Sequence, residues 1–228
     1  MKKILIIAIL TLPTFLMAQN LQVLYDFGKD RNYVTTTLEM FKPDKWGSTF
    51  YFVDFYYDFG PEKHPSGAYM EIARSLQFWK GPISAHVEYN GGLGTFPVGA
   101  DQYAYPINNA WLIGADYNMH NADFTKILTV QAMFKHIVGK QESAQLTAVW
   151  GLHFFKRKLS FTGFADFWLE DNSNSDGSLT HTVFLTQPQL WYNFGEHLSA
   201  GTEVELASNF AATSGFIVRP RLAIKWNF

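Results

Sequence analysis

The last ten residues alternate between apolar and polar side chains, and this alternation leaves the chain few possible folds. A period of two residues is typical of a β-strand whose two faces meet different surroundings. The apolar face is Leu222, Ile224, Trp226 and Phe228, and the polar face is Arg219, Arg221, Lys225 and Asn227. A water-soluble β-sandwich would turn the apolar face inward. A membrane barrel would turn it toward lipid and keep the charges in its lumen.

The amino-terminal residues have the pattern of a secretory signal. Lys2 and Lys3 precede an apolar run at residues 4–12, and a small residue follows at Ala18. A charged start, an apolar run and a small residue at the cleavage point define such signals. An uncleaved anchor is the alternative, but the run is short for crossing a bilayer. We predict a signal peptide at residues 1–18 and one outer-membrane barrel domain at 19–228.

The composition excludes several classes of protein. The chain has no cysteine, so it contains neither disulfides nor thiolate metal sites. Removing Lys2 and Lys3 from 18 basic residues leaves 16 against 20 acidic ones, a net charge of about −4 with no basic stripe for a nucleic-acid polymer. Aromatic residues make up 17 %, roughly double the average share. A mean hydropathy of −0.08 is typical of barrels, because alternating residues cancel.

Alternating runs of roughly strand length recur along the whole chain, which predicts an all-β fold. No later run of about 18 apolar residues would form a transmembrane helix. Eleven runs are long, and a shorter one at residues 21–27 would make twelve. The others are 32–41, 48–59, 68–79, 83–90, 109–119, 124–136, 144–155, 159–170, 179–194, 198–209 and 215–228.

The connections between these runs favour twelve strands. In a twelve-stranded up-and-down barrel, alternate connections lie at opposite ends, and both chain ends share the periplasmic side. One set contains every long connection: 28–31, 60–67, 91–106, 137–143, 171–178 and 210–214. The other set is short: 42–47, 80–82, 120–123, 156–158 and 195–197. We therefore predict a transmembrane antiparallel up-and-down β-barrel, closed by pairing of its first and last strands.

Two residues disturb the expected pattern. Arg74 lies on the apolar parity of its run, and a β-bulge would be needed to turn it inward. Pro188 lies in the middle of a run and predicts a bulge, because proline cannot donate to a ladder. Elsewhere, the apolar parity ends in aromatic residues suited to the two membrane interfaces. These are Trp111, Tyr117, Tyr192, Phe194 and Trp226.

The polar parity predicts a charged lumen. Its candidate residues are Glu39, Asp54, Asp58, Glu88, Asp166, Glu203, Glu205, Arg219 and Arg221. The acids of run 198–209 lie beside the bases of run 215–228, and opposed charges on one hairpin form pairs. Such pairs either stiffen a narrow barrel without touching solute, or form a constriction that orients a dipolar solute.

Aromatic residues share this inner parity. Phe50, Phe52 and Tyr56 accompany Asp54, and Trp168 accompanies Asp166. Aromatic rings that face water in a pore suit the stacking of a base. Alternatively, the rings plug the lumen of a small barrel.

The segment from Lys45 to Asp54, KWGSTFYFVD, preceded by TTLEMF at residues 36–41, resembles the opening strands of the Tsx-type nucleoside-specific channels. There an aromatic-glycine turn leads into an aromatic strand containing Asp. The resemblance implies a monomeric twelve-stranded outer-membrane barrel that binds nucleosides in a narrow lumen. By the motif itself, the binding role extends to Phe50, Phe52 and Asp54.

Three functions remain open at this point. The first is a passive channel for nucleosides or similar small solutes, with outer-membrane lipid and solute as its only partners. The second is a structural or adhesive barrel with a plugged lumen. The third is a barrel lipase or protease, although His153 and Ser160 flank one turn without a recognisable catalytic motif. A soluble secreted β-protein is disfavoured by the apolar parity. We expect no metal or cofactor.

Overall fold

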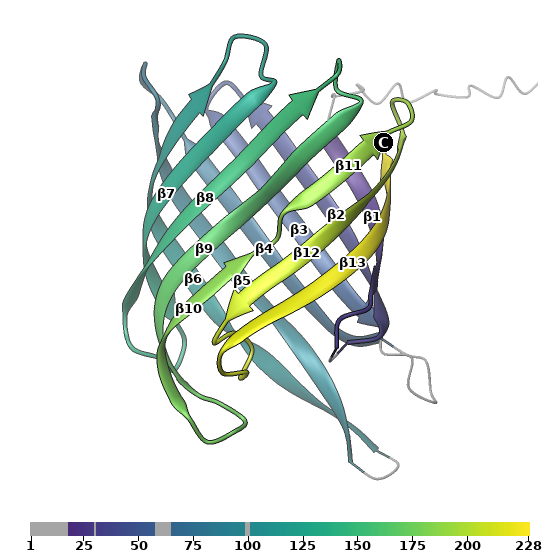
Figure 1. The fold of residues 1–228 in the computed structure, drawn as a ribbon. Helices are drawn as coiled ribbons and strands as arrows, with labels where there is room; N and C mark the ends of the chain where they lie inside the picture. Colours follow the sequence, from purple (N-terminus) through teal and green to yellow (C-terminus); the bar gives the residue numbers. More distant parts are fainter. Residues whose placement is uncertain (1–17, 30, 58–64, 99–100) are drawn as a thin grey trace, which may run out of the picture.

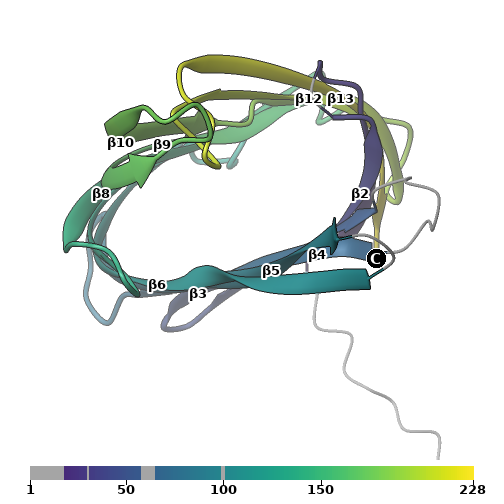
Figure 2. The same ribbon diagram turned by 90° about the horizontal axis from the view of Figure 1, so that it is seen from below.

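The computed structural model describes residues 18–29, 31–57, 65–98 and 101–228. They form one closed antiparallel sheet (Figures 1 and 2). The predicted signal lies outside the described residues except for Ala18, where the first strand begins. The strands are β1 (Ala18–Asp26), β2 (Tyr33–Asp44), β3 (Gly47–Tyr57), β4 (Pro65–Leu76), β5 (Ile83–Val98), β6 (Asp101–His120), β7 (Lys126–Ile137), β8 (Ser143–Phe154), β9 (Leu159–Ser173), β10 (Leu179–Thr186), β11 (Gln189–Asn193), β12 (Leu198–Ser208) and β13 (Phe216–Asn227).

Strands β10 and β11 are two halves of one interrupted strand, so the thirteen labelled segments form a twelve-stranded barrel, as predicted. Both halves pair with β9 on one side and β12 on the other. The break falls at Pro188, which confirms the predicted irregularity. The ladder is repaired by backbone groups: Gln187 N donates to Phe164 O, and Val204 N donates to Pro188 O.

The first and last strands close the ring. The register of β1 on β13 runs from Asn20 opposite Asn227 to Asp26 opposite Arg221, and Phe228 N donates to Gln19 O at 3.0 Å. The short run at 21–27 is therefore a real strand. Closure matters because an unpaired backbone edge is costly in lipid. Both termini of the barrel lie at the end that carries the turn 155–158, as predicted (Figure 1).

The prediction of a loop at 91–106 is wrong. Strands β5 and β6 continue through this segment as a paired ribbon that extends beyond the other connections in Figure 1. The register shifts between Asn90 and Gly92, so the glycines mark a bulge rather than the start of a loop. A side chain at Gly94 would lie 2.3 Å from the Tyr105 ring, so the glycine lets this ring cover the ladder.

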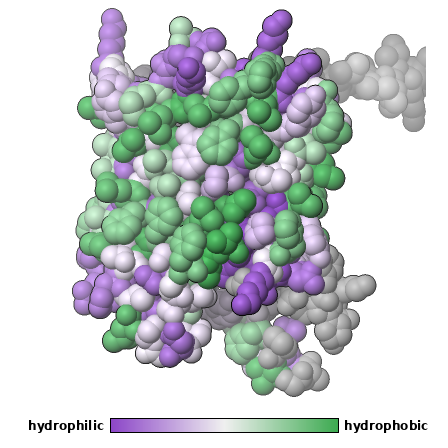
Figure 3. All heavy atoms as spheres, viewed as in Figure 1, coloured by the Kyte–Doolittle hydropathy of each residue, from purple (hydrophilic) through white to green (hydrophobic). Residues whose placement is uncertain are grey.

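The two faces of the sheet differ as the parity predicted. Leu21, Val23 and Tyr25 are exposed on the outer face, whereas Gln22 and Leu24 between them are buried inside. Apolar side chains gather around the middle of the surface in Figure 3, with hydrophilic ones at both rims. The five expected interface aromatics are all exposed on the outer face. This surface fits a bilayer, and a closed barrel that carries it is an outer-membrane protein. No helix in the described part of the chain is long and apolar enough to cross a membrane.

Arg74 is not turned inward by a bulge. The pairing of β3 with β4 is regular at this residue, so its side chain stays on the outer face. The guanidinium reaches Asp44 at 2.7 and 2.9 Å and the Thr49 hydroxyl at 3.0 Å. Because Asp44 lies next to a short turn, the charge is neutralised at the rim of the barrel.

Candidate functional site

The lumen gathers the residues predicted to line it. Register and parity place twelve of them on the inner face; Asp58 lies outside the described residues. The twelve are Glu39, Phe50, Phe52, Asp54, Tyr56, Glu88, Asp166, Trp168, Glu203, Glu205, Arg219 and Arg221. Most of them fall into three groups with different surroundings. Glu88 contacts His86, and Glu39 accepts a hydrogen bond from the Asn20 amide at 2.9 Å.

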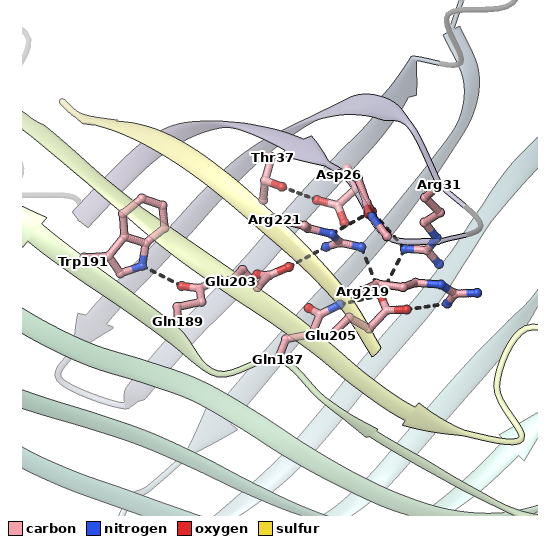
Figure 4. A network of polar contacts seen from close by, with 12 residues as sticks. Asp26, Arg31, Thr37, Gln187, Gln189, Trp191, Glu203, Glu205, Arg219 and Arg221 are labelled. Carbon is pink, nitrogen blue, oxygen red and sulfur yellow. Dashed lines mark hydrogen bonds and ion pairs between the residues drawn. The ribbon is translucent and has the colours of Figure 1, made fainter. Parts of the chain in front are cut away.

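The first group, which we call the arginine cluster, consists of Asp26, Arg31, Glu203, Glu205, Arg219 and Arg221 (Figure 4). Arg221 contacts Asp26 at 2.9 Å and Glu205 at 3.0 Å, and it also pairs with Glu203. Arg219 pairs with Glu205. The predicted pairing of acids and bases across this hairpin is confirmed.

Two members of the arginine cluster, Asp26 and Arg31, were not predicted from the sequence. Arg31, in the connection after β1, approaches Asp26 at 3.4 Å and Glu205 at 3.2 Å. Asp26 shares the inner parity of Asn20 and Gln22, so the alternation in β1 contained the signal for it. Arg31 lies outside any strand, where parity gives no direction.

The second group is an aromatic wall on β3 and β4. The Phe52 ring lies 6.1 Å from that of Phe50 and 6.0 Å from that of Tyr69, measured between centroids. Asp54 follows on the same face and accepts a hydrogen bond from the Thr37 hydroxyl at 2.5 Å. These side chains are half-buried rather than enclosed. The wall therefore offers ring faces and a carboxylate to the lumen.

In the third group, on β7 to β9, a base covers an aromatic ring. The Lys135 ammonium lies 4.0 Å from the centroid of Trp168 and donates to Gln145 at 2.7 Å. The Trp168 indole donates to Glu170 at 2.7 Å. Trp168 is inside the lumen as predicted, but it is buried and Lys135 lies over its ring. Lys225 covers Trp191 in the same way, at 4.0 Å.

Side chains fill the lumen along β5 to β7. His86 bridges Glu88 at 3.1 Å and Asp116 at 2.9 Å, and His86 and Asp116 are each only 2 % exposed. Leu112 and Met133 form a buried apolar patch on the same inner wall. This wall is packed like a protein interior, in contrast to the half-open aromatic wall.

The pair His153 and Ser160 lies on the inner face beside the turn 155–158. His153 Nδ1 is 2.9 Å from the Ser160 hydroxyl, which also accepts from Asn193 at 3.1 Å. Among the described residues, no carboxylate holds the histidine, so the pair lacks the third member of a catalytic triad. The described residues also contain no group of three His, Asp or Glu that could hold a metal ion.

Residues 18–228 match the family described as "Domain of unknown function (DUF5020)". The chain belongs to this family. No curated protein matches the sequence of this DUF5020 member. The solved structures that share its fold include two porins. The NanC porin aligns with a TM-score of 0.59 at 7 % identity, covering 92 % of this chain and 100 % of that one. The KdgM porin aligns with a TM-score of 0.51 at 11 % identity, covering 92 % and 99 %.

These similarities concern the fold and do not identify a solute. The DUF5020 barrel has the architecture of outer-membrane porins, which confirms the predicted fold class. The likeness to the Tsx-type nucleoside channels is clear over about residues 32–60 of the sequence and rests elsewhere on strand count and loop lengths. Nucleoside specificity therefore stays a prediction.

Proposed function

We propose that this protein is a monomeric outer-membrane channel through which nucleosides or similar small solutes diffuse passively. The carrying observation is the half-open aromatic wall, where Phe50, Phe52 and Tyr56 line the lumen beside Asp54. Aromatic rings left partly open to water are unfavourable unless a ligand covers them.

The chemistry of this wall suits a nucleoside. Stacking of a base on an aromatic side chain contributes about 1–3 kcal/mol. The Asp54 carboxylate can accept hydrogen bonds from ribose hydroxyls or an exocyclic amine. The arginine cluster, on β1, β12 and β13 and in the connection after β1, would narrow the passage and orient a dipolar solute. In this proposal, Glu39, Glu88, Asp166 and Trp168 line the passage together with the residues of the arginine cluster. Asp58 remains a candidate lumen residue from the sequence.

Single-channel conductance of the refolded barrel in a planar bilayer tests the proposal. We expect small open events that adenosine or thymidine blocks at micromolar to millimolar concentration. Phe52→Ala should weaken the block about 5- to 150-fold, the equivalent of one lost stacking contact, and Asp54→Ala should weaken it as well. Phe167→Ala, on the outer face, is the matched control and should leave the block unchanged. Conductance without nucleoside block would keep the pore and reject its specificity.

The second candidate is a structural or adhesive barrel with a plugged lumen. It is favoured by the wall of β5 to β7, where Leu112 is fully buried and His86 is 2 % exposed. If correctly folded protein gives no conductance in the bilayer, the structural barrel is the better interpretation. We propose no enzymatic activity, because Ser160 and His153 face the lumen and lack an acidic partner among the described residues.

A further inference from the structure

Three lumen carboxylates each keep one oxygen without a donor. Glu71 on β4 accepts from the Tyr69 hydroxyl at 2.7 Å, and Asp166 on β9 accepts from Thr147 at 2.6 Å, each through one oxygen. Glu88 on β5 meets His86 through one oxygen. Within the described chain, nothing donates to their other oxygens. The three groups lie close enough for their charges to interact across the lumen.

A buried amide adds a fourth free acceptor beside them. Asn90 lies directly opposite Glu71 in the pairing of β4 with β5, and two residues from Glu88 on the same face. Opposed residues on one face have Cβ atoms about 5 Å apart. Asn90 is 5 % exposed, and its Oδ1 has no hydrogen-bond partner in the structure. A buried acceptor without a donor costs free energy, so this oxygen indicates a missing partner.

The Lys135 ammonium does not supply that partner. Lys135 interacts electrostatically with Glu71, Glu88 and Asp166, but it forms no ion pair with them within 4.0 Å in the described part of the barrel. Its ammonium is held by Gln145 and by the ring of Trp168. Glu71 and Asp166 thus face the lumen without an ion pair among the described residues, whereas Glu88 is paired with His86 through one oxygen only.

A metal ion fits these acceptors poorly, and an organic cation fits them well. No three acids or histidines of the described residues are close enough together for a metal. An alkylammonium group carries three N–H donors and is larger, so it can bridge acceptors that do not converge on one point. Phe52 lies opposite Glu71 on β3, and an aromatic ring beside the acids would attract the same cation.

We propose that Glu71, Glu88, Asn90 and Asp166 form a subsite for the amino group of an organic cation. The inference rests on the proposed function, because the solute must enter the lumen to reach these residues. It adds solutes with a cationic amino group to the proposed class and assigns a binding role to Glu71 and Asn90.

Calorimetric titration of the refolded chain in micelles tests the subsite without requiring conduction. The probes are 1,4-diaminobutane and two molecules of similar length, neutral 1,4-butanediol and anionic succinate. We expect the diamine to bind at least about tenfold more tightly than either. Glu71→Gln and Asp166→Asn should each weaken diamine binding about ten- to hundredfold, the equivalent of one charged hydrogen bond. Glu142→Gln removes an exposed acid outside the lumen and should change nothing.

Equal binding of diamine and diol, or full diamine binding by both variants, would overturn the subsite. Folding of each variant is checked by heat-modifiable mobility and circular dichroism. If an acid variant does not fold, Asn90→Leu provides the second test and should weaken the diamine about tenfold. In a bilayer, a pore blocked by nucleosides but indifferent to the diamine would overturn the subsite and keep the channel. A barrel that binds the diamine in solution but shows no conductance would keep the subsite and reject the channel.

Discussion

Arg221 joins three strands through its side chain. It lies on β13 and contacts Asp26 on β1 and Glu203 and Glu205 on β12, so one guanidinium spans the closing seam and the last hairpin. It is 5 % exposed. Removing one partner of a buried ion pair leaves the other charges uncompensated, and this is more costly than losing an exposed pair.

We therefore expect Arg221→Met to lower the free energy of unfolding by about 3–5 kcal/mol. The measurement is a urea titration of the barrel in lipid vesicles, followed by tryptophan fluorescence. Lys45→Met is the control, because Lys45 is exposed and only stacks on Trp46 at a rim. A loss below about 1 kcal/mol for Arg221→Met would mean that the cluster tolerates the unpaired acids.

At this scale, parity predicted which side chains enter the lumen but not how they pair there. Glu203 and Arg221 are neighbours on one hairpin, so their contact followed from the sequence. Lys135 on Trp168 and Arg31 on Glu205 depend on side-chain direction and on strand tilt. A period-two pattern contains neither.

Hydrogen bonds join the β9–β10 and β12–β13 connections at the end of the barrel opposite the termini. Ser175 N, between β9 and β10, donates to Ala212 O, between β12 and β13, at 2.9 Å. Asp176 accepts hydrogen bonds from the amide and hydroxyl of Ser178 and from the hydroxyl of Ser214. These bonds favour the ionised carboxylate and lower the pKa of Asp176 to about 2.

The contact between these connections should depend on pH with a definite sign. Because the folded pKa is below the usual value of about 3.9, the contact contributes stability above pH 4 and loses it as pH falls toward 2. The Ser178 amide resonance should titrate with a midpoint near 2 in an NMR series, and Asp176→Asn should abolish the titration. A midpoint near 4 would show that the bonds are absent in solution.

The β5–β6 ribbon shows where element prediction failed. Gly91, Gly92 and Gly94 resemble loop residues in sequence, because isolated glycines weaken a strand. In the barrel they permit close approach instead, since a side chain at Gly92 would meet Ala68 O at 2.3 Å. Whether a glycine ends a strand or packs against its neighbour is decided by tertiary structure.

For the whole molecule, the alternation of connections was sufficient to predict closure. An even number of strands puts both ends on one side, and the structure pairs them as the predicted topology requires. The degree to which side chains fill the lumen was not predictable. It depends on contacts such as that of His86 with Asp116, which link β5 to β6.

Closure predicts that the barrel tolerates circular permutation. Joining residue 228 to 18 by a short Gly/Ser linker and opening the chain at the turn 195–197 keeps every ladder pair. We expect folded protein with the same circular dichroism and heat-modifiable mobility. Opening the chain inside β6 at residue 112 is the control and should abolish folding. Loss of folding in the first permutant would mean that the order of strands along the chain matters.

The β5–β6 ribbon is also the part of the described barrel that extends farthest from the end with the termini (Figure 1). From Asn90 to Val98, at about 3.3 Å per residue, the ribbon reaches well beyond the bulge, and Phe96, Tyr103 and Tyr105 are exposed along it. The predicted topology puts the termini on the periplasmic side, and it therefore predicts that this end is extracellular. An antibody or other large molecule that approaches this end therefore contacts the aromatic side chains of the β5–β6 ribbon before it reaches the mouth of the barrel.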